Sequence, residues 1–162
     1  MQEDELGILG VAALTEHYRS GDASPLEATR AALARIERFN DAVNAYTYVD
    51  AEGAEKAAKA SARRWGQGKP LSPIDGVPVS LKDLTNVAGM PTSNGSLLGS
   101  SEPCDADAPP AKRLREAGAI LLGKTNTPED GWKAVTDNRV FGATCNPWDT
   151  RPVSYTHLTL PT

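Results

Sequence analysis

The sequence is poor in the residues on which several common kinds of site depend. It contains two histidines and two cysteines among 162 residues. Cys104 and Cys145 lie far apart, with no histidine or further cysteine at metal-ligand spacing, so we expect free thiols rather than a disulfide or a zinc site. His17 falls within a helical pattern, which favours a surface or helix-packing position. This scarcity is compatible with catalysis by a hydroxyl group and a lysine, an alternative to the serine and histidine pair.

The chain also lacks an excess of positive charge and a long apolar run. Its formal net charge is -4, whereas nucleic acids and anionic membranes reward a clustered basic surface. No run approaches the roughly 20 apolar residues that span a bilayer, and the acidic start MQEDELGILG has no basic segment of the kind that opens a signal peptide. We therefore expect a cytoplasmic globular protein that binds no nucleic acid directly and no membrane.

The end of the chain differs from the rest. Residues 153–162 read VSYTHLTLPT, which matches one reading frame of a transposase-based sequencing adapter. We therefore expect residues 152–162 to be an adapter translation and the native sequence to end near Arg151. Such segments are excluded before any fold reasoning. The exclusion removes Ser154, Tyr155 and His157 from every catalytic argument.

The first seventy residues are expected to be mainly helical. Apolar residues from Leu6 to Leu14 recur at helical spacing, and Gly21 is a suitable stop, so one helix is predicted there. Ser24 to Glu27 has the form of a capping box with proline at the first helical position, which predicts a second helix to about Phe39. A short strand over 43–49 and a helix over 51–65 follow from alternation and helix propensity.

After the break at Gly66 to Pro70, short apolar strands alternate with a helix. The pattern predicts strands over 76–81 and 119–122 and a helix over 105–117. Alternation of this kind argues for an α/β fold, with N-terminal helices followed by strands of a mixed, partly parallel sheet and flanking helices. We expect residues 1–151 to form part of a single domain, mainly helical over 1–70 and motif-bearing over 71–151.

A phosphate-binding motif is apparent between Gly118 and Thr125. The sequence GAILLGKT satisfies the Walker A spacing and would suggest a nucleotide-binding protein. A phosphate loop, however, follows a strand and precedes a helix, whereas here the four middle residues themselves read as a strand. Pro128 also limits where a helix could begin. The strand interpretation is therefore preferred.

Lys82 is a candidate catalytic residue. It stands at the end of the apolar run that begins at Gly76. Taken alone, a lysine at a strand end is usually solvated, with its stem covering apolar surface. A catalytic role would depend on burial, which lowers the pKa of an ammonium group and yields a neutral amine able to accept a proton.

The segment from Gly89 to Ser96 is rich in turn formers and hydroxyl groups. Its ordinary interpretation is a surface loop. A functional interpretation places it beside a pocket, where its hydroxyls could hydrogen-bond a polar substrate. Spacing alone favours the surface loop.

Four segments together resemble the amidase signature family. They are DGVPVSLKDL, AGMPTSNGS, DADAPPAKRLREAGAILLGKTNTPE and FGATCNPWD, in this order between about Leu71 and Arg151. The resemblance implies hydrolysis of a carboxylic amide by a Ser, cis-Ser, Lys triad, with no metal or organic cofactor and a small-molecule amide as substrate. Lys82 falls on the family's catalytic lysine. Asp83 and Ser96 are candidates for supporting roles around it, and for Asp83 the alternative is a hydrogen-bond acceptor in the turn after the strand.

The same resemblance places both serines beyond the recognisable sequence. The family's glycine- and serine-rich signature begins just after the NPWD segment, where this chain has the suspected adapter. Neither serine can be assigned to a residue, Ser154 included, and we expect the chain as given to be inactive. One departure from the family pattern is Asp130, where an aromatic residue is usual; a buried, unpaired carboxylate there would cost several kcal/mol.

Alternatives to a general amidase remain at this point. The segment TNTPEDGWKAVTDN looks more like general amidases than like the A subunit of glutamyl-tRNA amidotransferase, which would bring partner subunits and is the second choice. A non-enzyme interpretation is a partial domain whose exposed apolar sheet face promotes aggregation. The sequence leaves the amide substrate and the oligomeric state open, with a homodimer among the options.

Overall fold

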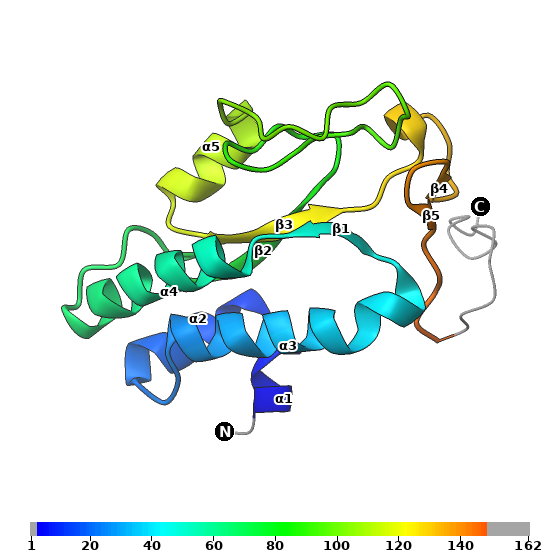
Figure 1. Cartoon of the computed structure of the whole chain (residues 1–162). Coiled ribbons are helices and arrows are strands. Elements are labelled where there is room, and N and C mark those ends of the chain that lie inside the picture. The colour runs from blue at the N-terminus through cyan, green and yellow to red at the C-terminus, as the bar shows by residue number, and fades with distance from the viewer. Residues whose placement is uncertain (1–2, 149–162) are drawn as a thin grey trace, which may run out of the picture.

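The computed structural model describes residues 3–148, so the expected adapter tail at 152–162 lies outside the described residues. Helices and strands form three layers in Figure 1, with a central sheet between α5 on one side and the pair α3 and α4 on the other. The helices are α1 (Glu3–Leu6), α2 (Val11–Ser20), α3 (Pro25–Val43), α4 (Ala51–Gly66), α5 (Pro109–Glu116) and the 3-10 turn η1 (Glu129–Gly131). The strands are β1 (Tyr46–Val49), β2 (Pro78–Lys82), β3 (Ile120–Thr125), β4 (Asp137–Asn138) and β5 (Gly142–Ala143).

The main sheet has the order β1-β3-β2. β2 runs parallel to β3, while β1 is antiparallel to it, which confirms the predicted mixed, partly parallel sheet. A shift in register between Val79 and Ser80 lets both β2 and β3 end together, with Lys82 opposite Thr125. The carboxyl ends of two parallel strands therefore meet at one edge of the sheet.

The N-terminal helix prediction was wrong in one respect. The chain forms two helices, α1 and α2, instead of one continuous helix, and the break spans Gly7 to Gly10. Glycine weakens a helix interior because it loses the most backbone freedom on folding. Gly21 ends α2 in the left-handed conformation, with φ of 81°, as its position predicted.

The helix α3 begins as predicted and ends later than predicted. The Ser24 hydroxyl accepts a hydrogen bond from the Glu27 backbone N-H, and the Glu27 side chain accepts one from the Ser24 backbone, which completes the capping box. The helix continues past Phe39 to Val43 and ends at Asn44, which has a left-handed backbone. Asparagine tolerates that conformation better than most residues, which suits it to the end of a helix.

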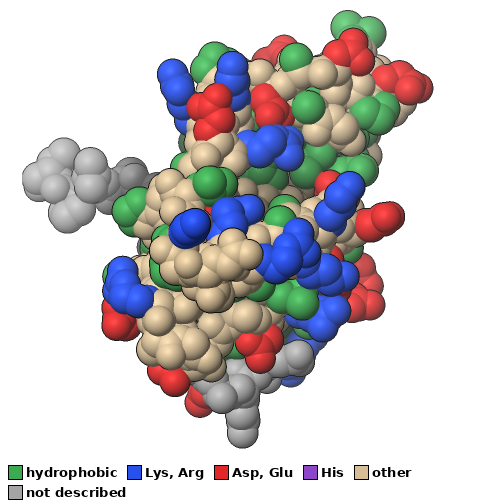
Figure 2. All heavy atoms as spheres, turned by 90° about the vertical axis from the view of Figure 1, so that its left-hand side faces the viewer, with side chains coloured by type: hydrophobic (Ala, Val, Ile, Leu, Met, Phe, Trp, Pro, Cys, Tyr) green, Lys and Arg blue, Asp and Glu red, His purple; other side chains and the backbone are tan. Residues whose placement is uncertain are grey.

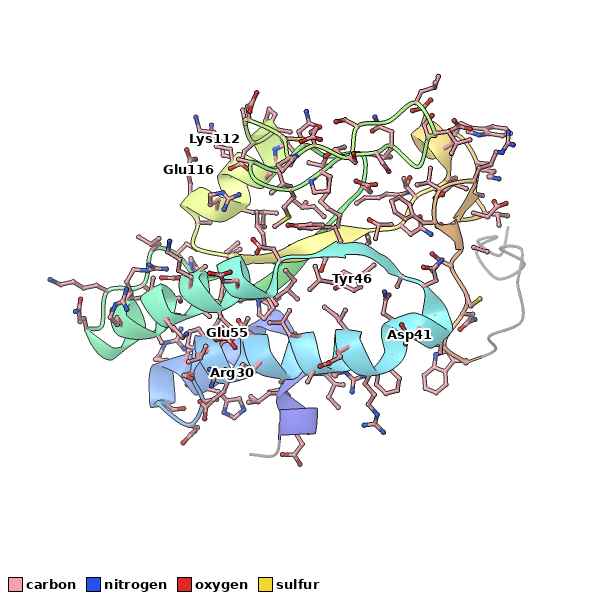
Figure 3. All side chains as sticks on the ribbon, in the orientation of Figure 1. Arg30, Asp41, Tyr46, Glu55, Lys112 and Glu116 are labelled. Carbon is pink, nitrogen blue, oxygen red and sulfur yellow. The ribbon has the colours of Figure 1, made fainter. Side chains whose placement is uncertain are left out.

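The helix α4 lies close to its predicted range. Asp50 caps α4 by accepting a hydrogen bond from the Gly53 N-H. On the outer surface, Arg30 of α3 forms an ion pair with Glu55 of α4, with Nε 3.0 Å from Oε1 (Figure 3). α5 is shorter than predicted because it begins at Pro109, and a residue before proline is disfavoured in the helical conformation.

Three apolar clusters hold the layers together. One joins α1, α2 and α3, the second joins α3 and α4 to one face of β3, and the third joins α5 and the loop after β2 to the other face. Their fully buried members include Ala28, Ala58, Ile120, Val87 and Ala111. The hypothesis of a partial domain whose exposed apolar sheet face promotes aggregation stays a prediction.

Asp75, the first residue of the motif DGVP, forms a buried polar cluster with Ser61, Arg64 and Leu71, which we call the staple. Asp75 is 0% exposed and accepts hydrogen bonds from the Arg64 guanidinium, the Ser61 hydroxyl and the Leu71 backbone N-H. Gly76 follows with φ of 86°, and a Cβ there would lie 2.6 Å from Pro25, so only glycine fits between the staple and α3. The staple joins α4 to the start of β2.

The remaining features concern the surface and the C-terminal part of the described chain. Both cysteines are free thiols, as predicted. Asn138 organises the hairpin of β4 and β5 by donating to Asn126 and accepting from the Phe141 N-H. Figure 2 shows acidic and basic side chains interspersed over one face of the molecule. Among the described residues, no helix is long and apolar enough to cross a membrane.

Candidate active site

Lys82 is the last residue of β2 and lies where the parallel strands end. Successive strand residues point to opposite faces of a sheet. Leu81 packs in the cluster that includes Ala111 of α5, so Lys82 lies on the opposite face. Its side chain is exposed, and within residues 3–148 it makes no hydrogen bond or ion pair. The described residues therefore do not bury the Lys82 side chain, and a catalytic role for Lys82 stays a prediction.

Two hydroxyl groups lie on the same face as Lys82. The Tyr46 phenol of β1 and the Ser80 hydroxyl of β2 share a hydrogen bond of 2.5 Å across the top of β3. Tyr46 lies on the side of the sheet that faces α3 (Figure 3). Neither residue stands out in the sequence, because the two are far apart along the chain and belong to no common motif.

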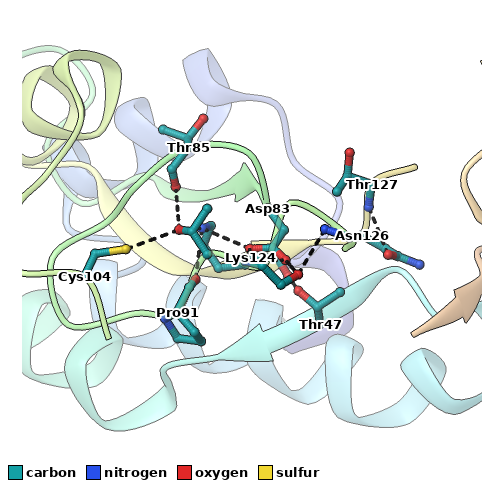
Figure 4. A network of polar contacts seen from close by, with 11 residues as sticks. Thr47, Asp83, Thr85, Pro91, Cys104, Lys124, Asn126 and Thr127 are labelled. Carbon is teal, nitrogen blue, oxygen red and sulfur yellow. Dashed lines mark hydrogen bonds and ion pairs between the residues drawn. The ribbon is translucent and has the colours of Figure 1, made fainter. Parts of the chain in front are cut away.

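Asp83 points to the opposite face and is 2% exposed. Its carboxylate lies 3.2 Å from the ammonium group of Lys124 (Figure 4). It also accepts a hydrogen bond of 2.5 Å from the Ser93 hydroxyl. Asp83 is thus a buried member of an ion pair, and its carboxylate also accepts hydrogen bonds from the loop after β2. Whether it supports catalysis stays a prediction.

Lys124 is fully buried, with 0% of its surface exposed. Its ammonium donates to the Thr92 hydroxyl at 2.7 Å and to the Pro91 carbonyl at 3.1 Å, so all three of its protons have acceptors when the Asp83 pair is included. Burial lowers the pKa of Lys124, and the neighbouring Asp83 carboxylate opposes that shift. The sequence did not reveal this role, because its motif presented Lys124 only as a phosphate ligand.

The loop from Gly89 to Ser96 is partly buried, in contrast to the surface loop that spacing favoured. Met90, Thr92 and Ser93 are each less than one tenth exposed. The reason is the polar network: the loop supplies the Thr92 and Ser93 hydroxyls to Lys124 and Asp83. The second interpretation, a loop beside a pocket, describes the structure better.

Ser96 lies in a cleft of about 320 Å³ beside this loop. Its hydroxyl donates to the Glu129 carboxylate at 2.7 Å. The cleft wall also includes Tyr48, Asp83 and Phe141. Lys82 is not among the lining residues, so the structure does not bring Ser96 and Lys82 together, and the supporting role of Ser96 stays a prediction.

The departure at Asp130 does not bury an unpaired carboxylate. Asp130 is exposed and has φ of 49° within η1. Aspartate is one of the few residues other than glycine that visit this left-handed region readily. The Asp130 carboxylate therefore does not incur the cost that burial would bring.

The GAILLGKT segment is a strand and not a phosphate loop. β3 covers Ile120–Thr125, and the residues after it form a loop, so no helix begins at Lys124. We expect isothermal titration of the complete protein with ATP and magnesium to show no binding, because the lysine that would reach the phosphates is buried against Asp83. Saturable binding in the micromolar range would contradict the strand interpretation.

Among residues 3–148 no group of three or more histidine, cysteine, aspartate or glutamate side chains is arranged to hold a metal ion. The chemistry open to the described residues at the end of the parallel strands is proton transfer and hydrogen bonding by lysine, tyrosine and serine. In open α/β sheets, ligands generally bind outside the carboxyl ends of the strands.

Comparisons with known proteins place this arrangement in a family. The family model described as Amidase matches residues 27–154, and the chain belongs to this family, the amidase signature family. The A subunit of the glutamyl-tRNA(Gln) amidotransferase of Salinispora arenicola is 42% identical over 147 residues, which cover 90% of this chain and 30% of that protein. An acylamidase of Rhodococcus erythropolis is 37% identical over 148 residues, covering 91% of this chain and 31% of that protein.

Solved structures agree with the sequence relatives. The peptide amidase of Stenotrophomonas maltophilia superposes with a TM-score of 0.82 at 31% identity, covering 91% of this chain and 31% of that chain. The α/β fold with a mixed sheet is therefore that of amidase-signature enzymes. This chain spans about 30% of the length of the curated relatives it matches.

Proposed function

We propose that the complete protein hydrolyses the C-N bond of a carboxylic amide and that Lys82 is its general base. The observation that carries the proposal is the contrast between the two lysines at the end of the parallel strands. Lys124 is buried and all its protons are bound, whereas Lys82 is uncommitted within the described residues. Lys82 also falls in the SLKD segment of a family of amide hydrolases.

The mechanism follows from the chemistry of an amine base. A neutral Lys82 amine takes a proton through a bridging serine hydroxyl, and a second serine attacks the amide carbonyl carbon. Backbone N-H groups stabilise the tetrahedral oxyanion. The Lys82 ammonium then returns the proton to the leaving amine, the C-N bond breaks, and water releases the acid from the acyl-enzyme. Neither serine is assigned to a residue of this chain.

The exposure of Lys82 sets a requirement for the complete protein. A general base must be unprotonated to accept a proton, and burial favours the neutral form of an amine. We propose that this burial comes from segments that pack over the end of β2. The triad, the substrate class and a cytoplasmic location remain proposals.

A second candidate is the A subunit of a glutamyl-tRNA amidotransferase. The observation in its favour is the 42% identity to the corresponding protein of Salinispora arenicola. It would act with partner subunits, whereas an amidase would act alone. The TNTPEDGWKAVTDN segment favours the amidase, which we keep as the first choice.

The experiment is to complete the gene, purify the encoded protein alone and offer it simple aliphatic, aromatic and peptide amides. We expect release of ammonia or amine without added metal or partner protein, and loss of activity after treatment with a serine-directed phosphonofluoridate. The second candidate would be favoured if the purified protein hydrolysed none of these amides and hydrolysed glutamine only after co-expression with partner subunits.

A further inference from the structure

We propose that Lys124 is a positioning residue for Lys82, acting through the buried carboxylate of Asp83. The inference rests on the proposed function of Lys82 and adds a second lysine to its site. Lys124 itself touches no reacting group in this proposal. It fixes the chain segment from which the base extends.

The contacts around the Asp83 side chain are complete. One carboxylate oxygen lies 3.2 Å from Lys124, and the other accepts the Ser93 hydroxyl at 2.5 Å. The Ser93 backbone N-H adds longer contacts of 3.3 and 3.4 Å to the two oxygens. The side chain of Asp83 is therefore held from both the neighbouring strand and the loop.

The backbone of Asp83 is held as well. Its N-H donates to the Thr125 carbonyl at 2.9 Å, which extends the ladder between β2 and β3 by one residue. Its carbonyl accepts from the Asn94 N-H at 3.1 Å. Because Lys82 and Asp83 share a peptide bond, these contacts fix the Cα position and direction of Lys82, whose own side chain has no partner among residues 3–148.

The energetics of the buried pair favour a positioning role over a stabilising one. A buried ion pair is weak evidence for stability, because removing two charges from water costs about as much as their attraction returns. An apolar pair of similar volume would fill the same space. A pair that is fully buried and saturated with hydrogen bonds instead fixes geometry, since each partner is costly to leave unpaired. The lowered pKa of Lys124, caused by burial, is consistent with that cost.

The location of the network brings it next to the base. The network lies on one face at the end of β2, and Lys82 lies on the other face one residue earlier. A change in the network is transmitted to Lys82 through a single peptide unit. A shift of about 1 Å in a catalytic group can reduce turnover by about 100-fold. We therefore expect substitutions at Lys124 to lower turnover without removing any group that contacts the substrate.

The experiment uses the completed protein and the variants Lys124→Met, Asp83→Asn and the double variant. Methionine keeps the length of lysine without its charge, and asparagine keeps the shape of aspartate. kcat, KM and melting temperature are measured for each with one amide substrate. The matched control is Asp75→Asn, which breaks another buried ion pair at the opposite end of β2, with Arg64 2.6 Å away.

We expect Lys124→Met and Asp83→Asn to lower kcat by about 10- to 100-fold with KM changed less than about two-fold. The kcat of the double variant should be no lower than that of the more severely impaired single variant, because the two residues act as one unit. Asp75→Asn should lower the melting temperature comparably but leave kcat of the folded protein within about two-fold of wild type. That contrast separates positioning from general stability.

Several outcomes would overturn the inference. These are an unchanged kcat in folded Lys124→Met, losses that multiply in the double variant, and equal losses of kcat in Lys124→Met and the Asp75→Asn control. If Lys124→Met does not fold, the inference is tested with Thr92→Val instead. It removes only the hydroxyl that accepts from Lys124, and a kcat equal to wild type would then refute the inference. A wild-type protein that hydrolyses no amide would instead overturn the proposed function, and a wild type whose activity survives Lys82→Ala would remove the base on which this inference depends.

Discussion

Lys82→Ala is expected to abolish amide hydrolysis by the completed protein. Loss of a general base typically reduces the rate by about 10² to 10⁴, or roughly 3 to 5 kcal/mol in activation free energy, and a member of a cooperating triad can cost more. The melting temperature should change little, because the Lys82 side chain makes no hydrogen bond or ion pair with the described residues, and its removal need not disturb their packing. Turnover and thermal unfolding are the two measurements.

Two further variants make the Lys82 test specific. Lys82→Arg should be nearly as damaging as Lys82→Ala, because a guanidinium stays protonated and cannot accept the proton. Lys112→Ala is the matched control. Lys112 lies on α5 with its side chain 67% exposed, and its ion pair with Glu116 is a surface pair (Figure 3), so turnover should stay within about two-fold of wild type. Retention of more than about a tenth of wild-type turnover by either Lys82 variant, with folding confirmed, would leave Lys82 a structural role only.

The local rules of sequence predicted the elements well where a single strong signal was present. The capping box from Ser24 to Glu27 fixed the start of α3, and Gly21 fixed the end of α2. The rules failed where two signals competed. Apolar spacing from Leu6 to Leu14 favoured one helix, but Gly7 and Gly10 interrupted it.

The sequence supplied only part of the candidate site. It pointed to Lys82, because this residue ends an apolar strand within a recognisable family motif. The pairing of Asp83 with Lys124 could not, since the two residues are far apart in sequence and meet only through the register of β2 on β3. The same holds for Tyr46 and Ser80, which meet across β3. Hydrophobic periodicity says which face a strand buries, and it says nothing about which polar groups the next strand brings.

Whether Lys82 is buried could not be predicted from its strand, for a related reason. Burial of a side chain at the edge of a sheet depends on segments that pack over that edge. An apolar run up to Leu81 predicts that the strand is covered, yet it cannot tell how far the covering layer extends. Within residues 3–148 no segment packs over the Lys82 side chain. On the opposite face of the sheet, the side chain of Asp83 is buried.

Arg64→Met is expected to destabilise the completed protein by about 3 to 5 kcal/mol, because it leaves the Asp75 carboxylate buried without its cation. Asp75 is 0% exposed and the Arg64 guanidinium lies 2.6 Å from it. The remaining hydrogen bonds, from Ser61 and Leu71, do not neutralise the charge. Urea unfolding at neutral pH measures the loss. Arg113→Met is the matched control, since that side chain is 83% exposed and its surface pair with Glu116 should contribute less than about 1 kcal/mol.

The pH dependence of the same pair gives an independent check. In the wild type, burial raises the pKa of the Asp75 carboxyl, but hydrogen bonds from Arg64, Leu71 and Ser61 outweigh it, so the pKa lies below its usual value. The stability that this group contributes is therefore present above the unfolded pKa of about 3.9 and is lost as the pH falls through the folded pKa. In Arg64→Met, burial prevails and raises the pKa of Asp75, so protonation relieves the unpaired charge as the pH falls. The difference in unfolding free energy between the two proteins should accordingly narrow from pH 7 toward about pH 4. A difference that stays constant over this range would mean that the Asp75 carboxylate is not the group that Arg64 stabilises.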